Sequence, residues 1–356
     1  MYYFKTLYIF FFIIALNIFF FSTKNVSAKS FQIDDIEISE PFKEKFDKNS
    51  VIDRGFRIAF FELLNLLVKS TDLNKVKLIK LNEIKSMIES FTIKEEKFID
   101  QTYYLILGVT FDNRKIYDYL EKKNIFPSQI KKEKFLFLPI IIDENTNDIL
   151  VYADNPLYKK WNLINGKNYL INFLLPTEDL EDFNFIKKKI NNIEKYNFEE
   201  IIKKYFLNNS IISLIFKEKS NIKVLSKIYI KDKEIILNNS FKSYDFNNEK
   251  ELNYFINELK IIYEDLWKEL NEINTSIKLP LIIRIDNQNL NISLKIENIF
   301  KDIDLIRYYS IKNFDKDYIY YEIIFNGTPQ NFIKIMNDKN YNFDTQNKIW
   351  ILKWEI

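Results

Sequence analysis

The chain has 356 residues, which is too long for one ordinary hydrophobic core and predicts two or three domains. Its 52 basic and 50 acidic residues are interleaved, so the basic patch that nucleic-acid-binding proteins carry is not expected. Histidine and cysteine are both absent, which excludes catalytic triads with an imidazole, catalytic thiols, disulfides and structural zinc sites.

The first 28 residues have the features of an export signal. Lys5 precedes an apolar run at 7–21, and a polar stretch then ends in the small residues 26–28. We therefore predict cleavage between Ala28 and Lys29 and a periplasmic location for the mature protein. The apolar run is shorter than the roughly 20 residues that span a bilayer. The alternative is an uncleaved segment that anchors the protein in the inner membrane, facing the periplasm.

Residues 29–165 are predicted to form an N-terminal α/β domain. Apolar periodicity indicates strands at 30–39, 103–111 and 135–143 and helices at 49–70, 81–91 and 113–124. Asn49 or Ser50 is the expected N-cap of the first helix. Pro139 cannot donate to a β-ladder, so it predicts an edge or a bulge in its strand.

Residues 166–276 are predicted to form a middle α/β domain that ends in a long helix. The pattern indicates a strand at 168–175, a helix at 198–209 and strands at 211–216, 222–230 and 233–241. Apolar residues at helical spacing then extend from about 249 to 273.

Residues 277–356 are predicted to form a C-terminal ferredoxin-like domain. The expected order is β-α-β-β-α-β, with Thr328 as N-cap and Pro329 at the first position of the second helix. The predicted fold class is thus α+β, with several domains in which helices pack on mixed or antiparallel sheets.

Four acidic residues lie within 178–182, between a predicted strand and a predicted helix. With Thr177 as N-cap they occupy the first turns, where the helix dipole favours negative charge. Helical geometry then predicts that Leu180 lies on the apolar face with residues 183, 186 and 190. Glu178, Glu181 and Asp182 are predicted to face water, and Asp179 lies at the edge of the apolar face.

Carboxylates in water keep ordinary pKa values and are poor acids or bases. We therefore interpret this stretch mainly as a helix start. Asp179 and Asp182, three residues apart, are the candidate contacts for a ligand or partner.

No cofactor or metal site is predicted. Only four glycines occur, and neither GxGxxG nor GxxxxGK[ST] is present. Residues 143–154 carry acidic and amide groups at the spacing of a calcium loop, but Asp148 occupies the position where the sharp turn needs glycine. This stretch also follows a strand, so a polar hairpin turn is the better interpretation.

The chain resembles a proteobacterial family catalogued as domain of unknown function 2066. The resemblance rests on four stretches, which are VIDRGFRIAFFELLNLLVKSTD, LGVTFDNRKIYDYLEKKNIFPS leading to FLFLPIIID, FLLPTEDLEDF, and the helix–strand pair around EEIIKKYF and IISLIF. It implies an exported envelope protein with no agreed activity and supplies no catalytic residues.

We therefore expect a non-enzymatic binding or scaffold protein of the cell envelope, which binds another envelope protein or a small ligand. One alternative is a hydrolase of envelope polysaccharide that uses two carboxylates about 5–10 Å apart. The other is a membrane-tethered subunit that retains residues 1–28. We expect no nucleic acid as a partner, and a membrane only if that segment stays uncleaved.

Overall fold

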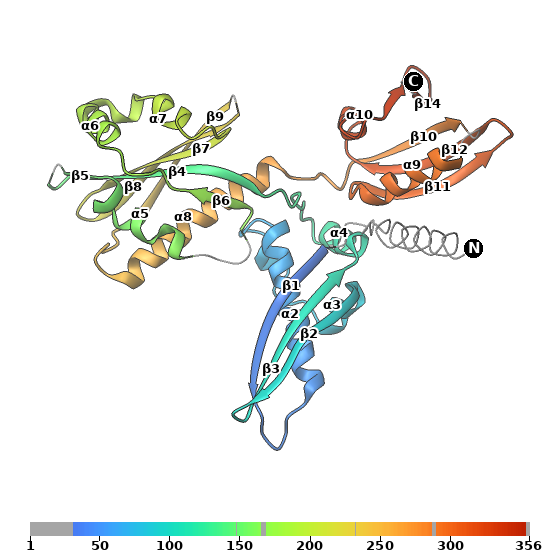
Figure 1. The fold of residues 1–356 in the computed structure, drawn as a ribbon, viewed down its shortest axis with the longest axis horizontal. Coiled ribbons are helices and arrows are strands. Elements are labelled where there is room, and N and C mark those ends of the chain that lie inside the picture. The colour runs from blue at the N-terminus through green and yellow to red at the C-terminus, as the bar shows by residue number, and fades with distance from the viewer. Residues whose placement is uncertain (1–30, 147, 165–168, 232, 287–289, 354–356) are drawn as a thin grey trace, which may run out of the picture. The chain divides into compact units, whose positions relative to one another are not determined.

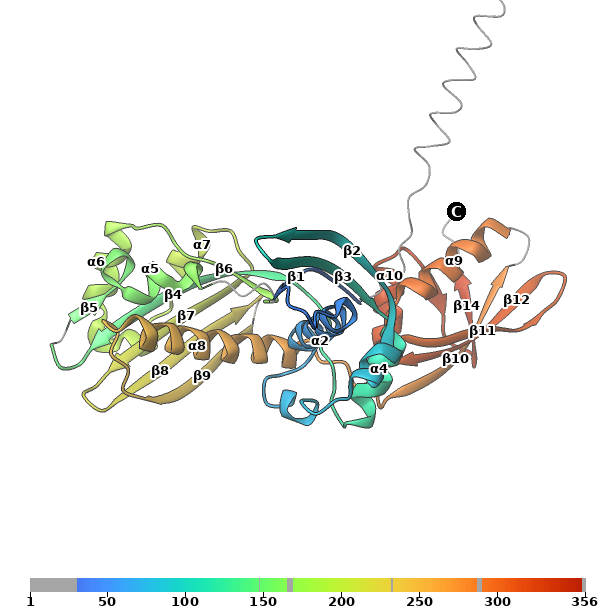
Figure 2. The ribbon, with the colours of Figure 1, turned by 90° about the horizontal axis from the view of Figure 1, so that it is seen from below.

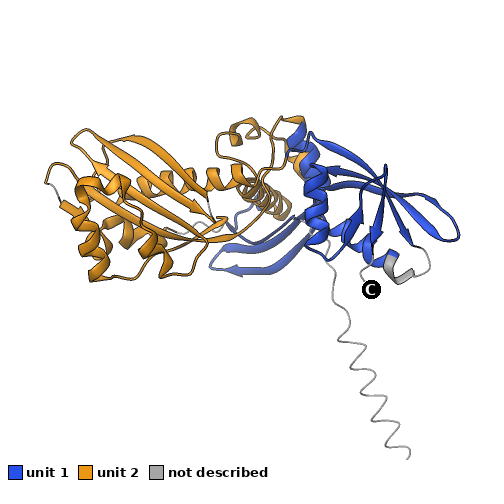
Figure 3. Cartoon of the chain, turned by 90° about the horizontal axis from the view of Figure 1, so that it is seen from above, with its two compact units in different colours: residues 1–46, 85–121, 274–356 blue, residues 47–84, 122–273 orange. Residues whose placement is uncertain are grey.

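The computed structural model describes residues 31–146, 148–164, 169–231, 233–286 and 290–353. The predicted export signal, with Ala28 and Lys29, lies outside these residues. The described chain is an α+β protein with three mixed or antiparallel sheets (Figure 1 and Figure 2). It forms two compact units, each built from separate chain segments (Figure 3). Unit 1 contains the described parts of 1–46, 85–121 and 274–356, and unit 2 contains those of 47–84 and 122–273.

The N-terminal sheet of unit 1 is antiparallel and has three strands in the order β1-β3-β2, which are β1 (Phe31–Pro41), β2 (Ile88–Ile99) and β3 (Thr102–Phe111). The prediction finds β1 and β3 but not β2. The expected helix at 81–91 ends early, as α3 (Leu81–Met87), and the chain continues as a strand that pairs with β3. Residues 88–99 lack a clear apolar alternation, so pairing with β3 rather than local pattern makes them a strand.

The remainder of unit 1 is a five-stranded sheet in the order β11-β12-β10-β14-β13. Its elements are β10 (Lys278–Asp286), α9 (Leu290–Asp302), β11 (Ile306–Phe314), β12 (Tyr318–Asn326), α10 (Pro329–Asn337), β13 (Asn342–Asp344) and β14 (Ile349–Lys353). Before this sheet in the chain, α4 (Asn113–Lys122) follows β3.

The C-terminal sheet follows the predicted element order through α10. Thr328 caps α10, since its hydroxyl accepts a hydrogen bond from the Asn331 amide at 3.3 Å, and this prediction is confirmed. The chain then forms the two strands β13 and β14 where one was expected, and β14 runs parallel to β10. Phe300 of α9 packs on Tyr321, and Phe332 of α10 packs on Phe325, so both helices contact one face of β12.

Unit 2 contains a six-stranded mixed sheet, in which β5-β4-β7-β8-β9 are neighbours and β6 also pairs with β4. The strands are β4 (Glu133–Asp143), β5 (Asp148–Leu150), β6 (Ile171–Leu174), β7 (Asn209–Lys217), β8 (Asn221–Ile230) and β9 (Lys233–Lys242). β4 pairs with β5, which precedes residue 165 in the chain, and with β6 and β7, which follow it. The predicted domain boundary at residue 165 therefore does not separate two sheets.

Helices cover both faces of this sheet. Unit 2 as a whole contains the helices α2 (Lys48–Leu67), α5 (Pro156–Lys160), α6 (Leu180–Lys188), α7 (Glu199–Lys203), α8 (Glu249–Leu270) and the short 3-10 helices η1 (Leu73–Lys75), η2 (Tyr152–Asp154), η3 (Trp161–Leu163) and η4 (Ile190–Lys195). Ile186, Ile193 and Ile201, from α6, η4 and α7, pack on one face of β4 and β7. On the other face Tyr263 of α8 hydrogen-bonds Ser213 of β7.

Several predicted helix limits in unit 2 differ from the structure, and two of them show why. Asp47, rather than Asn49 or Ser50, caps α2 and accepts the amides of both of those residues. The helix expected at 198–209 ends at Lys203, and β7 begins at Asn209. In both cases the apolar pattern gives the centre of the helix, while hydrogen bonds at the ends determine its limits.

The prediction that Pro139 marks an edge of the sheet is confirmed locally. On one side of β4, β6 pairs with residues 133–136 and β5 with residues 141–143, so Pro139 lies at the gap between them. The buried side chain of Asn155 fills this gap and donates to the Pro139 carbonyl at 2.9 Å. The missing N–H of proline therefore leaves no ladder hydrogen bond unmade there.

Candidate functional site

α6 begins directly after Asp179, whose carboxylate accepts the backbone amides of Glu181 and Asp182 at 2.8 and 3.2 Å. The prediction of Thr177 as N-cap is therefore wrong. A cap must reach the free amides of the second and third helical residues, which Thr177 is too far from the helix to do. Instead, the Thr177 amide donates to the Tyr205 hydroxyl at 2.9 Å.

Asp182 is buried in the structure, with 6% of its surface exposed, so the prediction that it faces water is wrong. Glu178 and Glu181 are exposed as predicted. Leu180, predicted on the apolar face, is 75% exposed, whereas Ile186 is completely buried. The inward face of α6 therefore runs through Asp182 and Ile186, one turn apart.

Lys204, the residue after α7, joins both candidate carboxylates. Its ammonium nitrogen lies 2.8 Å from Asp179 Oδ2 and 2.8 Å from Asp182 Oδ1. The hydrogen bond from Lys204 lowers the pKa of Asp179, and the hydrogen bonds to the two carboxylates raise the pKa of Lys204. Asp179 and Lys204 therefore keep their charges at neutral pH.

Three buried polar atoms around this ion pair have no hydrogen-bond partner, namely Asp182 Oδ2, Tyr152 Oη and Tyr196 Oη. Burial, together with the negative charge of Asp182, raises the pKa of Tyr152. Burial and the charges of Glu200 and Asp182 likewise raise the pKa of Tyr196. Both phenols are thus neutral at ordinary pH and have an O–H to donate.

The backbone at Tyr152 is strained. Its φ is +52°, a left-handed conformation that is uncommon outside glycine. The residue is also buried, with 5% of its surface exposed. Such a conformation costs about 1–3 kcal/mol and tends to occur at functional sites. We refer to Tyr152, Asp179, Asp182, Tyr196 and Lys204 as the acidic–tyrosine cluster.

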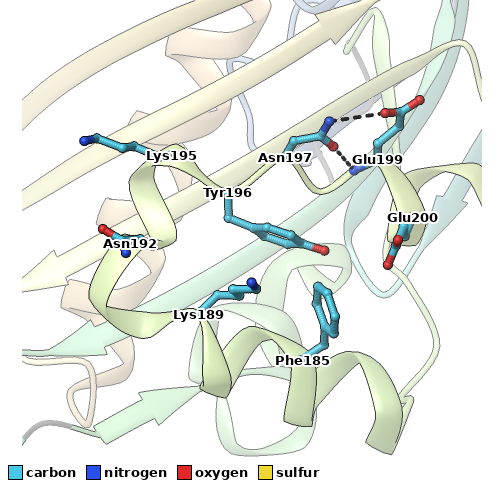
Figure 4. Close-up of a pocket in the computed structure, with 8 residues that line it drawn as sticks. All are labelled: Phe185, Lys189, Asn192, Lys195, Tyr196, Asn197, Glu199 and Glu200. Carbon is cyan, nitrogen blue, oxygen red and sulfur yellow. Dashed lines mark hydrogen bonds between the residues drawn. The ribbon is translucent and has the colours of Figure 1, made fainter.

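A hollow of about 450 Å³ adjoins the cluster at Tyr196 (Figure 4). Figure 4 shows the Tyr196 ring near Phe185, and the two ring centroids are 5.4 Å apart. The other lining residues carry amide groups and charges. Among them, Asn197 is held in place by hydrogen bonds with Glu199 at 2.7 and 3.2 Å. The complete lining is Phe185, Lys189, Asn192, Lys195, Tyr196, Asn197, Glu199 and Glu200.

This arrangement suits hydrogen-bond recognition better than proton transfer. A general acid or base works best with a pKa near the operating pH. The pKa of Asp179 is lowered, whereas those of Lys204 and Tyr152 are raised. Each shift moves the pKa further from neutral pH.

Within the residues that the structure describes, no group of three or more acidic side chains could hold a metal ion. Lys204 already occupies the position between Asp179 and Asp182 where a cation would bind. At the stretch that resembles a calcium loop, Asp143 Oδ1 accepts the Asn145 amide at 2.9 Å, as in a turn between β4 and β5. The prediction of a polar hairpin turn is confirmed.

The structure thus brings the two predicted residues, Asp179 and Asp182, together, but sequence reasoning misses Lys204, Tyr152 and Tyr196. Lys204 is one of many lysines, and 22 residues separate it from Asp182. Tyr152 lies within the stretch that resembles a calcium loop, but at none of its ligand positions. A positive φ at a tyrosine leaves no sign in the sequence, so only the fold could identify it.

No protein-family model matches this sequence, and a comparison with curated proteins also finds no match. None of the helices in the described parts of the chain combines the length and the apolar character that a membrane span requires.

Proposed function

We propose that the protein is an exported, non-enzymatic binding protein of the cell envelope, and that the acidic–tyrosine cluster and its hollow bind a small ligand with hydroxyl groups. The observation that carries this proposal is the pair of unpartnered buried atoms, Tyr152 Oη and Asp182 Oδ2. A buried polar group without a partner costs about 1–3 kcal/mol. Tyr152 and Asp182 do not line the hollow, so a ligand bound there reaches these two atoms by displacing the Tyr196 side chain, which does. A ligand that supplies both missing hydrogen bonds would recover that energy on binding.

The two atoms are complementary to a hydroxyl group. A neutral tyrosine donates a hydrogen bond and a carboxylate oxygen accepts one, and a hydroxyl can accept and donate at once. The adjoining hollow adds an aromatic face, Phe185, and the amides Asn192 and Asn197. A sugar ring presents several hydroxyls on its rim and C–H groups on its faces, so this combination favours a saccharide.

The charge states favour binding over hydrolysis. A carboxylate-dependent glycosidase needs one carboxyl with a raised pKa to protonate the leaving group. In this cluster the pKa of Asp179 is lowered by Lys204. The carboxyl of Glu264 does have a raised pKa because of burial, but it accepts the backbone amides of Leu170 and Ile171 at 3.1 and 2.7 Å and serves the packing of α8.

The proposal is tested by titrating the purified mature protein with glucose, galactose and N-acetylglucosamine and by following the thermal midpoint and the heat of binding. We expect at least one sugar to bind and to raise the midpoint. Tyr152→Phe and Asp182→Asn should each weaken that binding about tenfold or more, since each removes one buried hydrogen bond.

Glu181→Gln is the matched control for Asp182→Asn, because Glu181 is the exposed neighbour on the same helix. Tyr254→Phe, at an exposed tyrosine of α8, is the control for Tyr152→Phe. Both controls should bind as the unchanged protein does. If no sugar binds, or if the two cluster variants bind as well as the controls, the proposal is wrong.

A further inference from the structure

β2 is a long edge strand of the N-terminal sheet in unit 1, and it carries three carboxylates and two lysines. It spans twelve residues and pairs with β3 on one side, and no described strand pairs with its other side. A long edge strand presents a row of backbone N–H and C=O groups that can pair with another extended chain. Proteins usually shorten, cover or charge such an edge.

Apolar side chains of β2 are exposed although their neighbours on the same face are buried. Ile93 is in register with Leu107, and Phe98 with Tyr103. Leu107 and Tyr103 are almost completely buried, whereas Ile93 is 36% and Phe98 57% exposed. Side chains directly opposite each other on paired strands share a face, so the covered core of this sheet largely stops at β3. On β2, Ile93 stays partly exposed, and Phe98 meets the Phe42 ring at 4.7 Å between centroids but remains more than half exposed.

The opposite face of the sheet is also hollowed beside β2. A shallow groove of about 490 Å³ crosses all three strands, with Ile99 of β2 and Tyr104 of β3 among its lining residues. Both of these side chains are more than 40% exposed. β2 therefore offers apolar contacts on both faces as well as a backbone edge with which no described strand pairs.

The charge of this sheet is negative. β1 and β2 together contain seven carboxylates and two lysines, and β3 contains no charged residue. Both lysines are already used: Lys94 forms an ion pair with Asp34 at 2.6 Å, and Lys97 forms one with Glu95. A chain that lies beside β2 would therefore be favoured by positive charge.

We propose that β2 binds an extended segment of another polypeptide as a fourth strand, and that this segment alternates apolar and basic residues. Backbone hydrogen bonds to the edge would supply affinity, and alternate side chains would cover the apolar row and meet the carboxylates. A second copy of the same sheet fits less well, because two surfaces with excess negative charge repel each other. This inference is independent of the sugar site in unit 2.

The test uses the full mature protein and a fluorescent ten-residue peptide of alternating valine and lysine, with the valine–glutamate peptide as its counterpart. We expect the basic peptide to bind at least tenfold more tightly than the acidic one. In Ile93→Thr/Phe98→Thr, binding of the basic peptide should weaken about tenfold while its charge attraction is unchanged. Threonine keeps the β-propensity of the strand, and unchanged circular dichroism would verify folding.

The matched control is Ile236→Thr on β9, the edge strand of the sheet in unit 2, where Ile236 is also about half exposed. It should leave peptide binding unchanged. Hydrogen exchange should show new protection of β2 amides when the basic peptide is bound, and not of β9 amides. Equal binding of both peptides, binding that survives the double substitution, or β2 protection that instead grows with protein concentration alone would each overturn the proposal.

Discussion

Lys204 donates hydrogen bonds to the carboxylates of Asp179 and Asp182. Removing Lys204 would affect these two carboxylates differently. Asp179 also caps α6 and is partly exposed, whereas the side chain of Asp182 is 9% exposed and has one oxygen with no partner even when Lys204 is present. The energetic importance of Lys204 therefore comes mainly from Asp182. A buried carboxylate that loses its only ionic partner is left with an uncompensated desolvation cost.

We predict that Lys204→Met lowers the free energy of unfolding by about 1–3 kcal/mol, as expected for leaving a buried polar group unpaired. Urea denaturation monitored by circular dichroism measures this loss. Lys203→Met is the matched control: Lys203 pairs with Glu199, both side chains are more than half exposed, and exposed pairs contribute little. Similar losses in the two variants would show that Asp182 does not depend on Lys204.

The site also shows what sequence can and cannot provide at the scale of single residues. The acidic composition of 178–182 singles out Asp179 and Asp182, and the structure brings these two side chains together at Lys204. The orientation of Asp182 cannot be predicted, because helical periodicity treats a charged residue as outward-facing unless its partner is known. That partner, Lys204, is brought close only by the packing of η4 and α7 on the sheet.

Among the elements, α8 buries the apolar residues that its sequence pattern predicts and also charged residues that the pattern does not predict to be buried. Leu252, Phe255, Ile256 and Leu259 are buried as expected, and α8 begins at Glu249 as predicted and ends three residues early. Lys260 is also buried, and its nitrogen donates to the carbonyls of Trp161 and Ile164 at 2.8 and 2.5 Å. Burial lowers the pKa of Lys260 from the ordinary 10.5 to about 8.

This shift predicts a pH dependence of stability. Between pH 8 and 10.5 the unfolded chain binds more protons at Lys260 than the folded chain does, so the free energy of unfolding contributed by this group rises with pH in that window. Below about pH 8 the lysine is protonated in both states and its contribution is lowest. The neutral amine still has two hydrogens for the two carbonyls, so deprotonation does not break these contacts.

Thermal or urea unfolding between pH 7 and 9.5 tests this prediction. In Lys260→Met, the free energy of unfolding should lack the rise with pH that Lys260 contributes. The slope against pH is compared rather than the stability itself, because the substitution also removes two hydrogen bonds. Lys250→Met, at an exposed position of the same helix, should keep the slope of the unchanged protein. Identical slopes in the unchanged protein and Lys260→Met would contradict the pKa assigned to Lys260.

The elements that sequence predicts well are those whose signals are local. α8 has a long apolar stripe, and α10 has a cap followed by proline. β2 is missed because its side chains are exposed on both faces, and a strand without a buried face has no period of two. The property that conceals β2 from prediction is the same one that makes it a candidate docking edge.

For the whole molecule, long-range pairing rather than chain order defines the two units. The three predicted domains are continuous segments, whereas each observed unit collects segments that are far apart in the sequence. In unit 2, the Ser128 amide donates to the Leu67 carbonyl, and the Ile273 amide donates to the Pro127 carbonyl, each at 2.7 Å. These hydrogen bonds join segments 61 and 146 residues apart, which local patterns do not reveal.

At the scale of the whole molecule, the proposed function depends on the predicted export. The predicted leader, residues 1–28, contains two of the lysines and none of the acidic residues, so its removal would leave a mature chain with no net charge. Cleavage would place the start of the mature protein at Lys29, two residues before Phe31, where β1 begins. The folded units can then work in the periplasm without an attached apolar segment.

We predict that N-terminal sequencing of the protein purified from the periplasmic fraction begins at Lys29. Ala28→Trp should block cleavage and keep the full-length chain in the membrane fraction, because signal peptidase reads small residues at this position. Lys29→Ser lies on the mature side of the cut and should be processed normally. A full-length chain in the membrane fraction of the unchanged protein would favour the tethered subunit, and a full-length soluble chain in the cytoplasm would remove the basis for an envelope function.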